Sequence, residues 1–434
     1  MSVEFTTDSA LTARYQSILN KSHPHLQTLK THAWNLFSKQ GLPTPKNEAF
    51  QYCRRQHLQL EDWNLTQASN TDLEGFKSAL FQEKNSPRFL ANYDGVELNI
   101  LQDLPSAFSL ETFSASELND STLLNQIIGP EDLVESTKDT LAYLNDALFE
   151  NILVIKVHKF DEDLAKRGLQ LNLRQIASQG QFSKIIIHLA PSVEFKIALV
   201  EEVFQSEFHH LSVHVKLEEN SKLELCRVQT SDEVSSALTH IESIQAANSV
   251  YRQIQATMGA RIARHSIINL LQEPGAESNF FGVAVLDNKL QSHTHLQLEH
   301  QAAHTVSTQR FSQVLLDGSQ GSLDGTVVVC RDAQKVTSDQ LVKTLMLSEN
   351  SKAYGKPNLK IYADDVKCAH GNTCGELEDS YLFYLMSRGI AKDRAREILT
   401  RGFVEDILDE IHLPILKKAV DDKLLSRLIA KELA

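Results

Sequence analysis

Three side chains that suit a soft metal or a sulfur species lie near the end of the chain, in the sequence DDVKCAHGNTCGELEDS. Cys368, His370 and Cys374 supply thiol and imidazole groups, which are ligands for zinc, copper and iron–sulfur chemistry. If a strand ends at His370, alternation places His370 and Cys368 on one face, and a turn at Gly371–Asn372 brings Cys374 back towards them. Three ligands at this spacing match no closed zinc module. The alternative is an ordinary turn with a buried cysteine, a capping histidine and an incidental second cysteine.

A second candidate metal site is the pattern His293-Thr-His295-x₃-Glu299. Two histidines and a glutamate in this order are similar to the first motif of the cupins, a class of metal-binding β proteins. The glycines that support that motif are absent, because position 287 is Asp and position 306 is Val. Polar residues that alternate along a strand face are the alternative explanation.

Several catalytic motifs are absent from the sequence. It has no G-x-x-x-x-G-K-[ST] loop, no G-x-S-x-G elbow and no G-x-G-x-x-G turn. No motif in the sequence identifies a pair of side chains that could act as general acid and general base. We therefore expect a protein that is not an enzyme and does not itself hydrolyse ATP.

Length and charge restrict the class of protein further. The 434 residues predict two or three folding units. A net charge of −13 argues against a broad surface for nucleic acid or an anionic membrane. No stretch of about 18 apolar residues occurs, and the opening MSVEFTTDSA lacks the features of a signal peptide. We expect no membrane span and no nucleic-acid partner.

The cysteines favour a reducing compartment. Five of them are scattered thinly over the chain, and an odd number is a poor disulfide framework. Free thiols persist in the cytosol, so a cytoplasmic location is expected. They are Cys53, Cys226, Cys330, Cys368 and Cys374.

The elements that position these residues fall into three regions. Residues 1–140 form a helical and mixed N-terminal region, in which Ser22 is the expected cap of a helix that Gly41 ends. A hairpin is expected around Asp94–Gly95. Residues 141–370 form a β core and residues 371–434 a C-terminal helical domain.

The β core is predicted from short alternating runs. Leu211, Val213 and Val215 alternate with polar residues, and turn pairs such as Asp317–Gly318 separate successive runs. Few helical stretches intervene, so a doubly wound α/β sheet is not expected. A sandwich, a barrel and a β-solenoid all remain open, because no repeat of fixed period is visible.

Three motifs stand in the C-terminal third: Pro357-x-Leu359-x-Ile361, Asp365-Val366-x-Cys368-x-His370-Gly371 and Phe383-Tyr384-Leu385-x-Ser387-Arg388-Gly389-Ile390. With them, this part of the chain resembles the SufB/SufD family of scaffolds in the Suf system for iron–sulfur cluster assembly, specifically its SufD branch. Gly371 favours that branch over SufB, which has Glu at this position, and chain length agrees. Similarity near the N-terminus runs through Glu48 and Tyr52, while Phe50 replaces the usual Trp and Cys374 departs from the pattern.

This resemblance implies a fold, partners and a site. The fold is mainly β, a right-handed parallel β-helix core flanked by helical N-terminal and C-terminal parts. The partners are SufB, through the β-helix, and the SufC ATPase, with a homodimer when the chain is alone. An iron–sulfur cluster is held transiently at the partner interface by His370 and Cys368, and none is bound tightly by the lone subunit. The residues implied to bind SufC are Leu382, Tyr384, Leu385, Arg388, Gly389 and Phe403.

Overall fold

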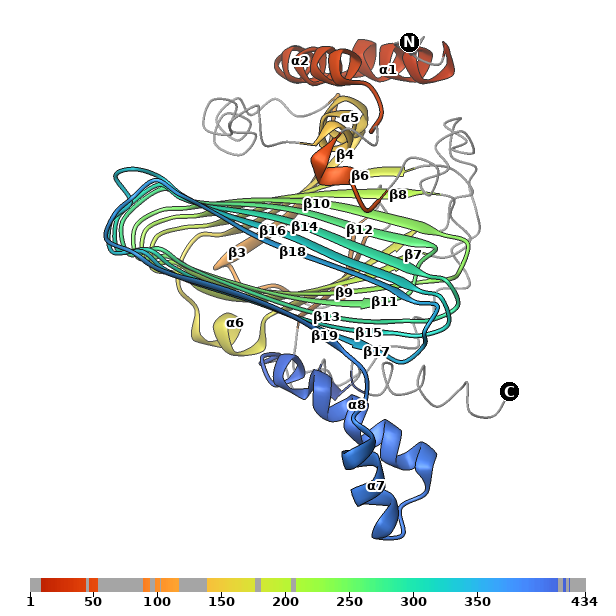
Figure 1. Ribbon diagram of the computed structural model, residues 1–434. Helices are drawn as coiled ribbons and strands as arrows, with labels where there is room; N and C mark the ends of the chain where they lie inside the picture. The colour runs from red at the N-terminus through yellow and green to blue at the C-terminus, as the bar shows by residue number, and fades with distance from the viewer. Residues whose placement is uncertain are drawn as a thin grey trace.

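The computed structural model describes residues 9–43, 47–53, 89–93, 98–101, 103–116, 139–175, 181–203, 208–412, 417–418 and 421. Its body is a parallel β-solenoid of about seven turns, with helices towards both ends of the chain (Figure 1). The expected β-helix core with helical N-terminal and C-terminal parts is therefore confirmed. The sandwich and barrel alternatives are wrong.

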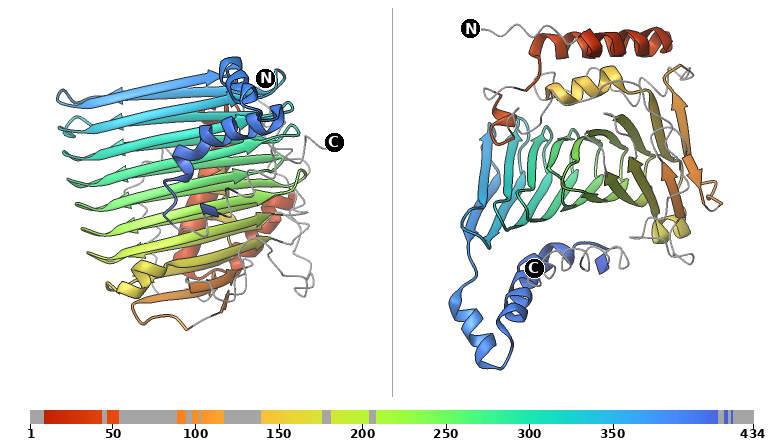
Figure 2. Two further views of the ribbon diagram at one scale, coloured as in Figure 1. Left: turned by 90° about the horizontal axis from the view of Figure 1, so that it is seen from below. Right: turned by 90° about the vertical axis from the view of Figure 1, so that its right-hand side faces the viewer.

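Each turn of the solenoid adds one strand to each of two facing sheets (Figure 2). One sheet has the order β19-β17-β15-β13-β11-β9-β7-β5-β1-β2 and the other β18-β16-β14-β12-β10-β8-β6-β4-β3. The strands are β1 Phe89–Tyr93, β2 Leu98–Ile100, β3 Phe108–Ser114, β4 Asn151–Val157, β5 Leu169–Gln175, β6 Gln181–Leu189, β7 Glu194–Val203, β8 His209–Leu217, β9 Lys222–Ser231, β10 Ser236–Gln245, β11 Val250–Met258, β12 Ile262–Leu271, β13 Glu277–Leu286, β14 Gln291–His300, β15 Val306–Leu315, β16 Gln320–Val329, β17 Thr337–Met346, β18 Lys352–Ile361 and β19 Lys367–Gly375.

Stacked strands keep one register, so alternate residues form inward columns along the solenoid. Leu211, Val213 and Val215 of β8 point into the core between the two sheets. The intervening residues of β8 are also mostly buried, because helices cover the outer face of this sheet. The half-buried strand expected here is thus buried on both faces.

One corner of the solenoid is built from residues with a left-handed backbone. Asn220, Asn248, Gly275 and His304 all have positive φ and occupy equivalent turns. Asparagine and glycine adopt this conformation most readily. At Gly275 a Cβ atom would also lie only 2.3 Å from Oδ1 of Asn248, so the stacked turns leave room for glycine alone.

Helices near the N-terminus lie over one sheet. The helices α1 Ser9–Lys21 and α2 Pro24–Gln40 lie outside α5 Thr140–Leu148, which packs on β6 and β8 (Figure 1). The expected cap at Ser22 is wrong: His23 is the N-cap of α2, and the Ser22 hydroxyl donates to Ile18 O at 2.7 Å.

Two other local predictions are confirmed. Gly41 ends α2 with φ of 70°. The expected hairpin is present as the antiparallel pair of β1 and β2, although its turn lies outside the described residues. The short elements η1 Glu48–Phe50 and α6 Glu162–Arg167 complete the N-terminal half.

The C-terminal helices differ from each other in their packing. Helix α7 Asp379–Ser387 has no buried residue and reaches away from the sheets (Figure 2). Helix α8 Lys392–Leu408 folds back and buries Val404, Ile407 and Leu408 against the outer face of the sheet that contains β9, β11, β13 and β15. Residues 422–434 of the expected C-terminal helical domain lie outside the described residues. In the described part of the chain, no helix is both long and apolar enough to span a membrane.

Candidate functional site

The solenoid ends in two strands that each have a free edge. Among the strands that the structure describes, β19 pairs only with β17, and β18 pairs only with β16. No further turn of the solenoid follows them in the described part of the chain, and every residue of both strands is exposed or half-buried. An uncovered sheet edge presents unpaired N–H and C=O groups, which can pair with another chain.

Cys368 and His370 continue two inward columns onto this open end. Cys368 stacks on Ser338 and His370 on Gln340, and both partners in β17 are buried. Cys368 is half-buried and packs against the main core, whereas His370 is exposed. The prediction that these two side chains share one face is confirmed by the register.

The turn expected at Gly371–Asn372 is wrong. Strand β19 continues to Gly375, so the backbone does not reverse after His370. At roughly 3.3 Å per residue, Cys374 lies about 13 Å along the strand from His370 and about 20 Å from Cys368. The structure therefore brings together two of the three candidate ligands.

The Cys368 thiol is held mainly in its neutral form. Burial raises the pKa of this thiol, and a hydrogen bond with the backbone of Ser338 opposes the rise. A metal ion would displace the proton, since thiolate is the ligand form. Within the described residues, no group of three or more His, Cys, Asp or Glu side chains is placed to hold a metal. Among the described residues, this end of the solenoid therefore offers two candidate ligands, Cys368 and His370.

The second candidate, His293, His295 and Glu299, lies along the outer face of β14. The hydroxyl of Ser322 is 2.7 Å from Nδ1 of His293, and Asp324 lies 3.6 Å from Nδ1 of His295. Glu299 is about 13 Å further along the strand from His295. These side chains do not converge, and cupins are double-sheet jelly rolls rather than parallel solenoids. The cupin-like alternative is wrong.

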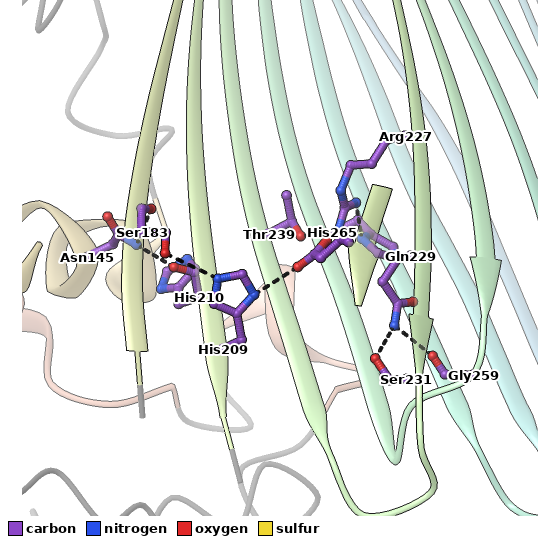
Figure 3. Close-up of polar contacts among 11 residues, drawn as sticks. Asn145, Ser183, His209, His210, Arg227, Gln229, Ser231, Thr239, Gly259 and His265 are labelled. Atoms are coloured by element: carbon purple, nitrogen blue, oxygen red, sulfur yellow. Dashed lines mark hydrogen bonds and ion pairs between the residues drawn. The ribbon is translucent and has the colours of Figure 1, made fainter. Parts of the chain in front are cut away.

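A buried charged cluster inside the solenoid was not predicted from the sequence (Figure 3). Nη2 of Arg227 donates to Glu201 at 2.5 Å, and its Nη1 donates to Nδ1 of His265 at 2.8 Å. Nδ1 of His209 lies 3.0 Å from the same Glu201 carboxylate. The cluster joins strands of both sheets. The only sequence signal for it is charge at inward positions of apolar strands.

The electrostatics of this cluster follow from its burial. Burial alone would raise the pKa of Glu201, but Arg227 and His209 lower it to about 2. Burial, together with the Arg227 charge, lowers the pKa of His265, so this imidazole is neutral and accepts the guanidinium hydrogen bond. Because every member is out of contact with water, the cluster is a structural tie between the sheets.

The residues expected to bind an ATPase lie around α7, with one exception. Tyr384 is 54% exposed, and the neighbouring Phe383 is 74% exposed. The Arg388 guanidinium lies 4.6 Å from the centre of the Tyr384 ring, and Gly389 follows with φ of 84°. Leu382 and Leu385 are half-buried. Phe403 instead belongs to α8, is half-buried and packs against the sheet under that helix.

Comparison with known proteins agrees with this architecture. The family model described as "SUF system FeS cluster assembly, SufBD core domain" matches residues 172–403. An iron–sulfur cluster assembly SufBD family protein of Synechocystis is 24% identical over 400 residues, covering 89% of this chain and 87% of the relative. The iron–sulfur cluster assembly protein SufD of Escherichia coli is 24% identical over 386 residues, covering 88% of each.

A plant protein matches a shorter part. The chloroplastic protein ABCI7 of Arabidopsis thaliana is 30% identical over 203 residues, which cover 46% of this chain and 42% of the relative. The core-domain match includes the strands from β6 to β19 and helix α7. The chain therefore belongs to the SufBD family of the Suf system for iron–sulfur cluster assembly.

Proposed function

We propose that this chain is a non-catalytic scaffold subunit that supports iron–sulfur cluster assembly together with SufB and the SufC ATPase in the cytoplasm. The observation that carries the proposal is the placement of Cys368 and His370 at the open end of the solenoid. The cluster is cargo, held between this chain and a partner. Family membership supports the same role.

The geometry suits a cluster that must be released. Two side chains from this subunit cannot complete the coordination of a cluster, which usually takes four ligands. SufB, added at the edges of β18 and β19, would supply the others. Such a shared site opens whenever the two chains separate, whereas four thiolates on one chain would retain the cluster. A second copy of this chain can occupy the same edges when SufB is absent.

Metal analysis of the complex tests this proposal. Co-expressed with its SufB and SufC partners and purified without oxygen, the chain is expected to carry iron and sulfide in comparable amounts. Purified alone, it is expected to carry little of either, because its own ligands are too few. About one tightly bound metal per lone chain, or a metal-free complex, would contradict the shared site.

Helix α7 is the proposed docking element for SufC. Its aromatic side chains Tyr381, Phe383 and Tyr384 are all more than half exposed, an unusual concentration for a nine-residue helix. Exposed aromatic residues of this kind are typical anchors of protein interfaces. Removing α7 and α8 together would uncover the sheet under α8, so a point substitution tests the interface more cleanly.

Phe383→Glu is expected to weaken SufC binding at least tenfold while the melting temperature stays unchanged. Loss of a central aromatic anchor typically costs about 2 kcal/mol or more of binding free energy. Binding to purified SufC can be measured by calorimetry. Val234→Glu is the matched control, because Val234 is also an exposed apolar residue, 64% exposed, but lies on the turn between β9 and β10. Equal affinities for the two variants would place the SufC site elsewhere.

A further inference from the structure

Gln340 lies directly beneath His370 in the inward column that ends at the open edge. Its side chain is only 1% exposed. Nε2 of Gln340 donates to Oε1 of Gln309, one turn deeper, at 2.8 Å. Oε1 of Gln340 is buried and has no hydrogen-bond partner among the described residues. A buried acceptor without a partner is uncommon and costs free energy, which calls for an explanation.

The opposite sheet is shaped around this carboxamide. Gly325 of β16 faces it, and a Cβ atom at that position would lie 2.0 Å from Nε2 of Gln340. Any larger residue would push the amide out of its place. The absence of a side chain at Gly325 thus leaves the space that the Gln340 amide occupies in the column under His370.

His370 is the complementary group. It is exposed on the last strand, and no hydrogen bond or ion pair ties its ring to another described residue. An imidazole that binds metal through one nitrogen usually donates its other N–H to an acceptor in the protein. Gln340 is the residue in register directly below it, and Oε1 of Gln340 is a buried acceptor without a partner among the described residues.

We propose that Gln340 positions His370 for iron by accepting a hydrogen bond from the imidazole N–H. The bond fixes one tautomer, so the lone pair of the other nitrogen faces the open end. This proposal rests on the proposed function, because it assumes that His370 binds iron. A neutral amide orients the ring without adding a negative charge to the site. A histidine oriented by an amide binds the metal less firmly than one oriented by a carboxylate would, which suits a cluster that must be released.

Cobalt titration of the cluster-free complex with SufB and SufC tests this role. Co²⁺ serves as the probe because its absorption bands report the ligands directly. Gln340→Met keeps the volume and removes the acceptor, so affinity for Co²⁺ is expected to fall about tenfold or more, the usual effect of losing such a partner. Gln340→Glu keeps an acceptor oxygen and is expected to restore binding to at least the parent level.

The matched control is Gln309→Met. It breaks the same Gln309–Gln340 hydrogen bond but leaves the oxygen under His370, so Co²⁺ affinity is expected to stay within about twofold while stability falls as in Gln340→Met. Gly325→Ala, which displaces the amide without deleting it, is expected to weaken Co²⁺ binding as Gln340→Met does.

The outcomes separate this inference from the function on which it rests. Equal loss of Co²⁺ affinity in Gln309→Met and Gln340→Met, or no rescue by Gln340→Glu, would overturn the positioning role. If His370→Ala loses Co²⁺ binding while Gln340→Met keeps it, the inference fails and the proposed function stands. If His370→Ala binds Co²⁺ as the parent does, the proposed function itself fails.

Discussion

His370→Ala is expected to give a complex that assembles with SufB and SufC and melts like the parent, but carries little iron or sulfide. The side chain is exposed and has no hydrogen-bond partner among the described residues, so its loss breaks no contact that holds the fold together. The free energy of unfolding should change by less than roughly 1 kcal/mol, as is usual for exposed sites. Iron content and melting temperature, measured on one purified complex, test both parts.

The matched control for this experiment is Cys374→Ala. Cys374 lies in the same inward row of the same strand and is also exposed, but it is about 13 Å further along. We expect this variant to load iron and sulfide normally. A loss equal to that of His370→Ala would mean that Cys374 is a ligand. If His370→Ala instead melts early and loads normally, the histidine has a structural role only.

Local alternation was enough to place Cys368 and His370 on one face, because that rule depends only on the extended backbone. The preference of residue types for turns was misleading at the next residues. Gly371, Asn372 and Thr373 are typical of a turn, yet they pair with β17 through to Gly375. Hydrogen bonding to a neighbouring strand outweighs a weak local preference for a turn. That strand is distant in the sequence, so the residues around Gly371 do not reveal it.

The repeat of the solenoid is hidden for a related reason. The stacked residues Val250, Glu277, Val306 and Thr337 are separated by unequal numbers of residues, because the corner turns differ in length. The inward columns also mix apolar residues with glutamine and serine, which blurs the alternation. The left-handed corners at Asn220 and Asn248 are the clearest signal that sequence reasoning missed.

The charged cluster inside the solenoid is invisible to pattern rules. A charged residue that interrupts an apolar strand is normally assigned to the solvent face, whereas Glu201 and Arg227 both point inward. They tolerate burial only because each neutralises the other across adjacent strands. Recognising this requires the pairing of β7 with β9, which is a property of the fold.

Arg227→Ala is expected to lower the free energy of unfolding by about 3–5 kcal/mol, the largest stability effect foreseen for this chain. Removing one partner of a fully buried ion pair leaves the other charge uncompensated in a medium of low polarity. Here Glu201 would lose its main cation, and the guanidinium hydrogen bond to His265 would vanish as well. Urea unfolding measures the change, and Arg310→Ala, at an exposed position of β15, should stay within about 0.5 kcal/mol.

The dependence of this loss on pH identifies its cause. In the parent, the pKa of Glu201 is lowered to about 2, below its value of about 4.3 in an unfolded chain. The ion pair therefore stabilises the fold above pH 4.3, and this stabilisation disappears as the pH falls towards 2. In Arg227→Ala, burial favours the neutral acid, which needs no cation. The difference in unfolding free energy between parent and variant should therefore be larger at pH 7.5 than at pH 5.

Adding Glu201→Gln to Arg227→Ala should recover part of the loss at pH 7.5, because it removes the uncompensated charge. A loss that is independent of pH and unchanged in the double variant would mean that a cavity, rather than charge, is responsible.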